Sequence, residues 1–155
     1  SYKSKGYYNG SSDYITFASK SAPYAFELHE GTTPTLQFRA DTSGIQARDY
    51  IKISCMVYCN ELQYDHYKQA VLAATFLHGG NQIRWRCVRL QTKIDNKDHL
   101  ILHIGKERQW QYVYFFVRVP HRFKDAGDLL QVNVWNPSNM PVIVDDVQVE
   151  YWKVK

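Results

Sequence analysis

The sequence predicts an all-β protein, a sandwich or barrel of about ten strands. Short apolar runs alternate with turn signals such as EGTTP, DTSG, HGGN and NPSNMP along the chain. No segment keeps a helical apolar period for long enough to form an ordinary amphipathic helix. Aromatic residues, which fit pleated surfaces, make up 15% of the composition.

The predicted strands follow one another at short and regular spacing. They are residues 14–18, 24–29, 35–40, 50–60, 69–78, 83–92, 99–104, 110–119, 129–135 and 142–152. The pair Gly79–Gly80 predicts a hairpin turn, and residues 61–69 are expected to form a loop or a single helical turn. We expect one domain over residues 1–155, with residues 1–13 as a flexible N-terminal segment.

Alternation along three of these strands predicts which side chains face the core. The inward side chains are Ile51, Ile53, Cys55, Val57, Cys59, Val113, Phe115, Val117, Val119, Leu130, Val132 and Val134. The outward side chains of the two later strands are Trp110, Tyr112, Tyr114, Phe116, Arg118, Gln131, Asn133 and Trp135.

Size and charge limit the classes of partner. A chain of 155 residues can bury a sizeable single core. Its net charge of +4 is spread along the sequence, so nucleic acid is not an expected partner. No apolar run is long enough to span a membrane, so membrane insertion is not expected. The N-terminal stretch SYKSKGYYNGSS lacks the apolar core of a signal peptide.

The three cysteines are Cys55, Cys59 and Cys87. Four residues along a strand span about 13 Å, too far for Cys55 to bond Cys59 unless the strand breaks. One of them could pair with Cys87 on a neighbouring strand, but buried free thiols are the favoured interpretation.

The outward side chains of residues 110–119 and 129–135 suggest a binding platform. The two strands follow each other in sequence, so we expect them to pair as antiparallel neighbours. Pairing would place Tyr112, Tyr114 and Phe116 beside Gln131, Asn133 and Trp135. Aromatic rings stack on the C–H patches of sugar rings, while amides and guanidinium groups bond their hydroxyls. Arg118 belongs to this platform, joined by Tyr58 or Arg86 if their strands adjoin it. The alternative is a secondary core covered by a loop.

Arginines also gather on the strands, at Arg84, Arg86, Arg89 and Arg118. Arg84 and Arg86 share one face of their strand, opposite Trp85 and Cys87. One hypothesis is that guanidinium groups recognise an acidic glycan, and the alternative is a solvated strand face.

No arrangement of residues indicates catalysis. The sequence contains neither a G-x-S-x-G motif nor a glycine-rich phosphate loop. His99 and His103 would lie about 13 Å apart on a strand, too far to hold one metal ion. Asp145 and Asp146 are adjacent, so a regular strand would point them to opposite faces. We therefore do not expect an enzyme.

The stretch from Trp110 to the C-terminus resembles the ending of β-jelly-roll carbohydrate-binding modules with a galactose-binding-domain-like fold. The resemblance lies in Trp110, the Val119–Pro120 strand end, the apolar strand 129–135 and the final Asp145–Asp146–Val147. It implies a two-sheet antiparallel β-sandwich that binds glycans without catalysis. Many such modules hold one structural calcium ion through an acidic residue of the last strand.

Carried onto this sequence, the resemblance implies Asp145 or Asp146 as a Ca²⁺ ligand, with Glu27 or Glu30 as a partner carboxylate. It also implies a secreted or cell-surface protein that binds a polysaccharide or oligosaccharide, with a catalytic domain as a partner in a parent chain. Two alternatives stay open, a structural or protein-interaction sandwich without a sugar site and, ranked lower, a small glycan-active enzyme.

Overall fold

A computed structural model describes residues 2–5, 14–15, 25–33, 35–91 and 109–152 of the chain. Within them lie the strands β1 (Tyr2–Lys5), β2 (Tyr14–Ile15), β3 (Ala25–Leu28), β4 (Gly31–Thr32), β5 (Leu36–Arg39), β6 (Tyr50–Tyr58), β7 (Val71–His78), β8 (Asn81–Arg89), β9 (Gln111–Arg118), β10 (Leu129–Asn136) and β11 (Val142–Trp152). The predicted strand 99–104 lies outside the described residues. Of the N-terminal segment expected to be flexible, residues 2–5 form β1, while residues 1 and 6–13 are not described.

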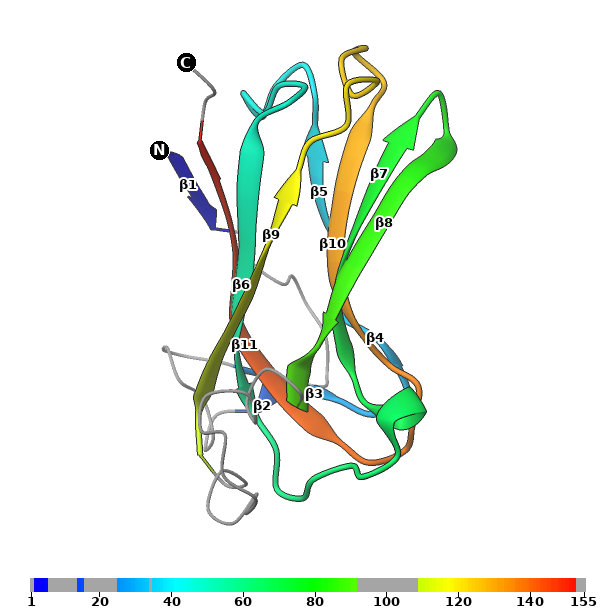
Figure 1. Cartoon of the computed structure of the whole chain (residues 1–155). Helices are drawn as coiled ribbons and strands as arrows, with labels where there is room; N and C mark the ends of the chain where they lie inside the picture. The colour runs from blue at the N-terminus through cyan, green and yellow to red at the C-terminus, as the bar shows by residue number, and fades with distance from the viewer. Residues whose placement is uncertain (1, 6–13, 16–24, 34, 92–108, 153–155) are drawn as a thin grey trace.

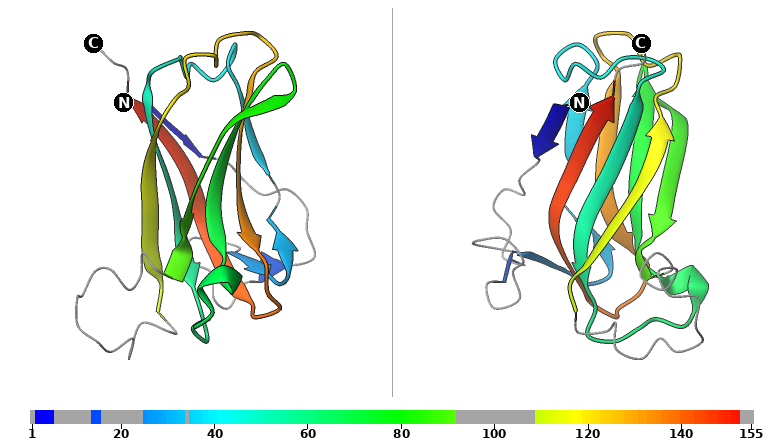
Figure 2. Two further views of the ribbon diagram at one scale, coloured as in Figure 1. Left: turned by 45° about the vertical axis from the view of Figure 1, so that its right-hand side comes forward. Right: turned by 60° about the vertical axis from the view of Figure 1, so that its left-hand side comes forward.

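The strands form two sheets that pack face to face (Figures 1 and 2). The first sheet has the order β2-β3-β11-β6-β9, and β1 also pairs with β11. The second has the order β4-β10-β7-β8, and β5 also pairs with β10. Every described pairing is antiparallel. The predicted all-β, two-sheet antiparallel sandwich is confirmed.

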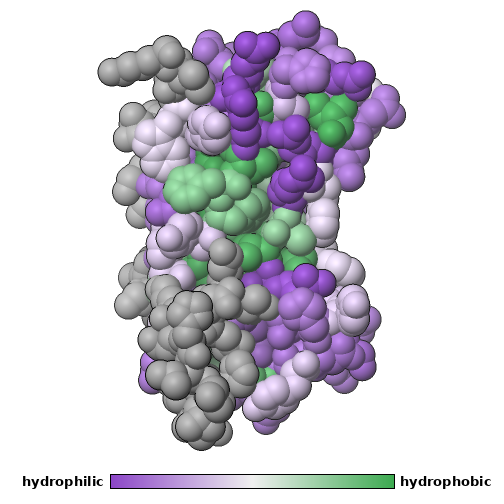
Figure 3. All heavy atoms as spheres, viewed as in Figure 1, coloured by the Kyte–Doolittle hydropathy of each residue, from purple (hydrophilic) through white to green (hydrophobic). Residues whose placement is uncertain are grey.

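The core lies between the sheets and contains the side chains that alternation assigns to it. Ile51, Ile53, Cys55 and Val57 are fully buried on β6. The inward residues of β9 and β10 join the same cluster, with Phe115 half-buried at the edge. Figure 3 shows apolar side chains along the gap between the two sheets, on the side where their edge strands β9 and β8 face the viewer.

Two local turns follow their sequence signals. Gly79 and Gly80, with φ of 55° and 80°, connect β7 to β8, and positive φ at both central positions is the requirement of a type I′ hairpin. The region 61–69 contains a single 3₁₀ turn, η1 (His66–Lys68), and the Asp65 side chain accepts a hydrogen bond from the Tyr67 amide at its start.

The predicted pairing of residues 110–119 with 129–135 is wrong. β9 pairs with β6 in the first sheet, whereas β10 pairs with β7 in the second. The connection between them crosses from one sheet to the other, because Phe123 is fully buried and packs edge-on against Phe76 at 5.5 Å between ring centroids. Burial of Phe123 in the middle of the connection holds this segment over the core, so β9 and β10 do not form a hairpin.

The acidic pair of β11 forms a β-bulge. Asp145 lies opposite Met56 and Gln148 opposite Ser54, so Asp146 and Val147 together face the single residue Cys55. Asp146 has a φ of +50°, and its amide donates to Asp145 Oδ1 at 2.7 Å. The extra residue resets the alternation, because Val144 and Val147 both point into the core. The prediction that the two carboxylates point to opposite faces assumed a regular strand, and the bulge makes the strand irregular at this point.

All three cysteines are free thiols. Cys55 and Cys59 are buried on the inward side of the first sheet, and burial raises the pKa of the Cys55 thiol to about 12. Cys87 is half-buried on the opposite side of the molecule, directly across from Ala73 on the outer face of the second sheet. The favoured interpretation as free thiols is confirmed.

Candidate functional site

The outer face of the second sheet brings two tryptophans and two amides together. Register places Trp85 beside Thr75 and Thr75 beside Gln131, so these three side chains share one face. Asn133 and Trp135 follow on the same face of β10. We call this surface, with Trp85, Trp135, Gln131 and Asn133, the tryptophan face.

Both indoles of the tryptophan face are available to a ligand. Trp85 is 41% exposed and Trp135 46% exposed. Within the described residues neither ring packs against another ring. Ala73 lies between Cys87 and Asn133 on the same face and is itself buried.

Polar groups line the same face. Gln131 lies between Thr75 and Gln37, so two amide side chains are neighbours across β10 and β5. The Asn133 amide nitrogen donates to Thr35 Oγ1 at 3.4 Å, which leaves its carbonyl oxygen as an acceptor. Chemically, this face offers two stacking platforms about four strand positions apart along the sheet, with amide donors and acceptors between them.

The outer face of the first sheet carries a different arrangement of aromatic residues. Tyr112, Tyr114, Phe116 and Trp152 form an aromatic row in which successive ring centroids lie 5.6, 5.8 and 5.9 Å apart. The rings are tilted or edge-to-face, a favourable geometry for aromatic pairs. The row is exposed, most strongly at Phe116 with 57%.

Lys52 occupies the surface of the aromatic row. Its Nζ lies 5.0 Å from the Tyr112 centroid and 4.7 Å from the Tyr114 centroid, and 3.9 Å from Glu150 Oε2. The hydrogen bond with Tyr112 raises the pKa of Lys52 and outweighs burial, which lowers it. The ring faces nearest Lys52 are therefore already in contact with an internal cation.

The predicted platform is divided between these two faces. Tyr112, Tyr114 and Arg118 lie on the first sheet, and Tyr58 is near them, packed against Trp110 at 5.6 Å. Gln131, Asn133 and Trp135 lie together on the second sheet. Arg86 is exposed on edge strand β8, where its guanidinium donates to the Trp85 carbonyl. Trp85 was not among the predicted site residues, although its alternation with Arg84 and Arg86 was visible in the sequence.

The acidic residues predicted to bind calcium lie on neighbouring strands. Glu27 is opposite Ile143 on β11, two positions before Asp145, and its carboxylate lies 3.5 Å from His29 Nε2. Glu30 is exposed in the turn after β3. Within the described residues, the one group of three potential ligand atoms that lie within 4.8 Å of each other is His78, Asp125 and Asp128.

Asp128, the buried member of that group, holds together the loops at one end of the sandwich, and we call its carboxylate the pin. The buried Asp128 carboxylate accepts hydrogen bonds from the amides of Lys124, Asp125 and Gly79 and lies 3.0 Å from His78 Nδ1. Burial by itself raises the pKa of Asp128, but these hydrogen bonds lower it to about 2. They use the lone pairs that a metal ion would need.

The predicted basic cluster is also divided. Arg84 reaches across to β9 and donates from Nη1 to the Arg118 backbone carbonyl at 2.8 Å, so the Arg84 side chain meets the backbone of Arg118. Arg89 instead donates from Nε to the His66 carbonyl at 2.9 Å, beside η1. No helix in the described part of the chain is long and apolar enough to cross a membrane.

Comparison with solved structures supports the fold. A family 16 carbohydrate-binding module matches with a TM-score of 0.50 and 12% identity, over 88% of this chain and 83% of that one. The CBM22-1–GH10 modules of the Clostridium thermocellum xylanase 10B, complexed with xylohexaose, match with a TM-score of 0.52 and 10% identity, over 92% of this chain and 24% of that one. This chain therefore spans about a quarter of the xylanase structure.

A Stig cyclase, Fisc from Fischerella sp. TAU, also matches, with a TM-score of 0.51 and 12% identity over 99% of this chain and 76% of that one. No protein-family model matches the sequence, and a search of curated proteins finds no match. At these identities the likeness shows the fold alone: this chain has the β-sandwich fold found in carbohydrate-binding modules, and the same fold occurs in a cyclase.

Proposed function

We propose that the protein is a non-catalytic carbohydrate-binding module that holds a secreted or cell-surface protein on a polysaccharide through its tryptophan face. The observation that carries the proposal is the placement of exposed Trp85 and Trp135 on one face, with Gln131 and Asn133 between them. Stacking on the indoles would position the sugar rings, and the amides would bond their hydroxyl groups.

The tryptophan face suits a sugar chain better than the aromatic row does. A sugar ring needs the flat face of an aromatic ring to be free, and the rings of the row lie against each other and under Lys52. The two indoles have no such partners among the described residues. The fold shared with carbohydrate-binding modules supports the same class of function.

Native affinity gels with neutral polysaccharides (xylan, mixed-linkage glucan, galactan and mannan) test the proposal. We expect at least one polymer to retard the wild-type protein. Trp85→Ala and Trp135→Ala should each weaken retardation roughly tenfold, the loss of one central stacking contact. Tyr114→Ala is the matched control on the aromatic row and should be retarded like the wild type.

Four outcomes would contradict this assignment. Equal retardation of the wild type and both tryptophan variants would exclude the tryptophan face. Loss in Tyr114→Ala alone would assign binding to the aromatic row. The absence of retardation by any polymer would favour a protein-interaction sandwich, and release of reducing sugar during incubation would favour a glycan-active enzyme.

A structural calcium ion is a separate part of the proposal. Asp145 or Asp146 would supply the ligand from the bulge, with Glu27 or Glu30 as a second carboxylate, because Ca²⁺ prefers several oxygen ligands. A chelator should then lower the melting temperature, and added CaCl₂ should restore it. Asp146→Asn should reduce the response to the chelator, while an unchanged melting temperature in the chelator would exclude the ion.

A further inference from the structure

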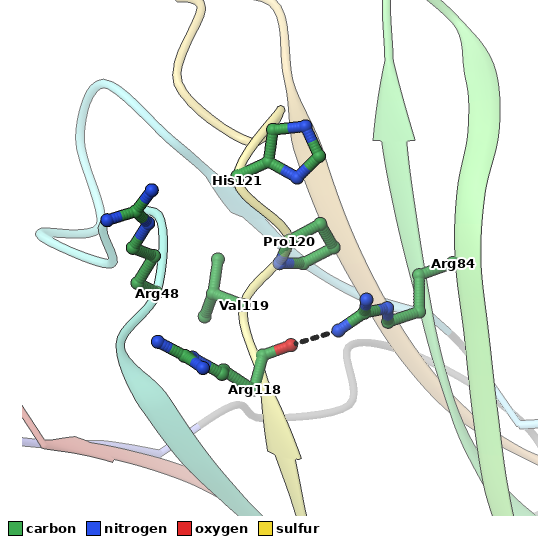
Figure 4. A pocket seen from close by; sticks show the side chains of 6 residues that line it. All are labelled: Arg48, Arg84, Arg118, Val119, Pro120 and His121. Carbon is green, nitrogen blue, oxygen red and sulfur yellow. Dashed lines mark hydrogen bonds between the residues drawn. The ribbon is translucent and has the colours of Figure 1, made fainter.

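Three arginines and a histidine surround a pocket at one end of the sandwich (Figure 4). The pocket has a volume of about 360 Å³ and is lined by Arg48, Arg84, Arg118, Val119, Pro120 and His121. Val119 and Pro120 are buried and form its floor, whereas the arginines and the histidine are accessible to solvent at its rim. Figure 4 shows Arg48 and Arg118 on one side of the Val119–Pro120 backbone and Arg84 on the other.

Hydrogen bonds to backbone groups hold the three arginine-bearing segments together. Arg48, in the loop before β6, donates its amide to the Val119 carbonyl at 3.0 Å, and the Val119 amide donates to the Asp49 carbonyl at 2.8 Å. Arg84 Nη1 ties β8 to β9 through the Arg118 carbonyl. The arginines thus come from three places: the loop before β6 for Arg48, β9 in the first sheet for Arg118, and β8 in the second sheet for Arg84.

Arg48 has a backbone conformation that its side chain does not favour. Its φ is +72°, in the left-handed region where glycine or asparagine is usual and a long side chain is strained. Such strain persists where the surrounding structure fixes it, and it gathers at functional positions. Here the strained loop presents a guanidinium to the pocket (Figure 4).

Within the described residues, the positive charge of the pocket has no acidic counter-ion. No acidic side chain of the described part of the chain lines the pocket, and the ion pairs there involve none of its three arginines. Arg39 shows the contrast, because Asp41 engages it at two atoms, 2.8 and 3.0 Å away. The neighbouring Asp49 directs Oδ2 to the Gln46 amide at 2.9 Å.

We propose that this pocket binds an oxyanion, a carboxylate or sulfate group carried by a polysaccharide. Guanidinium groups match the planar oxygens of these groups with paired N–H donors. The site is separate from the tryptophan face, because Arg84 and Trp85 are consecutive on β8 and lie on opposite sides of it. The anion chemistry stands on the pocket alone, whereas the glycan as its carrier rests on the proposed function.

Nucleic acid fits the pocket less well than an acidic glycan does. Among the described lining residues, the His121 imidazole is the single aromatic ring on which a base could stack. The net charge of +4 is small, and the arginines form a single cluster instead of a stripe that could follow a phosphate backbone.

Matched charged and neutral polymers test the proposal by titration calorimetry. Polygalacturonate is compared with its methyl ester, and dextran sulfate with dextran, so that each pair differs in charge on one backbone. We expect at least one charged polymer to bind and its neutral counterpart to bind far more weakly. The preference for carboxylate or sulfate identifies the natural group. Added NaCl should weaken binding, since the rim is exposed to solvent.

The variants Arg48→Asn, Arg84→Gln and Arg118→Gln should each weaken binding of the charged polymer roughly tenfold or more, as expected for a lost charged hydrogen bond. Arg48→Asn is the safest for folding, because asparagine tolerates the left-handed backbone at this position. Arg122→Gln is the matched control, an exposed arginine of the same loop that does not line the pocket. It should bind like the wild type.

Several outcomes would overturn the proposal. They are binding to neither charged polymer, equal loss of binding in Arg122→Gln and the pocket variants, and tighter binding to a single-stranded DNA oligomer than to either polymer.

The Trp135→Ala variant separates the two proposals. Its binding of neutral polysaccharide should be roughly tenfold weaker, but it should keep its response to sodium sulfate, read as a rise in melting temperature over sodium chloride of equal ionic strength. If the tryptophan face fails its own test and the sulfate response remains, the pocket is an anion site of a protein that does not bind glycan.

Discussion

The two outer faces of the sandwich both expose aromatic rings, but they use them differently. On the first sheet, the rings of the aromatic row contact one another in sequence, and Lys52 lies over two of them. On the second sheet, Trp85 and Trp135 stand apart and share their face with the amides of Gln131 and Asn133. Exposure alone does not distinguish these surfaces, since both are about equally open. The difference is whether the ring faces already have partners.

The strands that carry these two sets of residues are consecutive in the chain. β9 holds most of the aromatic row, and β10 holds Gln131, Asn133 and Trp135. The connection between them ends at Asp128, which binds the loop amides of Lys124 and Asp125 and the hairpin of β7 and β8 at Gly79. Asp128 therefore helps to fix the position of the tryptophan face relative to the rest of the sandwich.

The largest effect is expected when this pin is removed. Asp128→Asn should lower the free energy of unfolding at pH 7 by about 2 kcal/mol, because the hydrogen bonds that hold the pKa of Asp128 near 2, against an ordinary 3.8, stabilise the folded state by that order. The folded pKa is the lower one, so the contribution is complete above about pH 4 and is lost as the pH falls toward 2.

Urea unfolding at pH 7, 4 and 2.5 measures this effect. The wild type should lose its advantage over Asp128→Asn as the pH falls. Asp125→Asn is the control, because its carboxylate is 63% exposed and lies 3.7 Å from His78, so the cost should be below about 0.5 kcal/mol. Equal unfolding free energies for Asp128→Asn and the wild type at pH 7 would show that Asp128 is not a pin.

The second effect compares one ring from each face. Tyr114→Ala should cost about 1 kcal/mol more unfolding free energy than Trp135→Ala, because Tyr114 loses contacts with Tyr112, Phe116 and Lys52. Trp135 has no ring partner among the described residues, although its indole is larger. Chemical denaturation of the two variants measures the difference. A larger cost for Trp135→Ala would mean that the tryptophan face is the structural surface.

Much of the fold followed from local rules in the sequence. The inward sets of β6, β9 and β10 came from alternation alone, because apolar side chains recur at every second position of each strand. The glycine pair located the β7–β8 hairpin, because glycine readily supplies the two positive φ angles. These features depend on neighbouring residues only.

The candidate site could not be assembled in the same way, since it depends on which strands are neighbours. A buried Phe123 in the connection separates β9 from β10, and no rule of alternation contains that information. Bulges add a second difficulty. An irregularity between the Phe76–Arg84 and Leu77–Gln82 pairs shifts β8 by one residue, so counting from the hairpin would place Arg84 instead of Trp85 opposite Thr75.

A third prediction uses Cys87 as a reporter of the tryptophan face. Cys87 lies in the same row as Ala73 and is half-buried, whereas Cys55 and Cys59 are buried in the core. Burial raises the pKa of the Cys87 thiol, so alkylation should be slow at pH 7 and faster at higher pH. A saturating polysaccharide should slow this alkylation several-fold, as measured by mass spectrometry.

Cys87→Ser should take up no label in the folded state, which verifies that the core thiols do not react with the alkylating reagent. Unchanged labelling of Cys87 in the presence of a polysaccharide that demonstrably binds would show that the ligand binds away from the tryptophan face. If bound polysaccharide still protects Cys87 from alkylation in Trp135→Ala, at the same fraction of protein bound, the ligand lies on the tryptophan face but depends less on the Trp135 indole.

The smallest effect is expected from Lys52→Met, which keeps most of the apolar stem and removes the cation. The ammonium contacts the Tyr112 and Tyr114 rings and lies 3.9 Å from Glu150, with its side chain 20% exposed. Its removal should cost about 0.5 kcal/mol at pH 7. Because the folded pKa is raised above the ordinary 10.5, this contribution is complete below that pH and disappears as the pH rises through the folded value.

Lys68→Met is the control, since that side chain is 62% exposed beside Asp65 and contacts no described ring. If Lys52→Met, added to Trp135→Ala, restored the polysaccharide retardation that Trp135→Ala alone had weakened, the Lys52 cation would be what distinguishes the aromatic row from a binding surface.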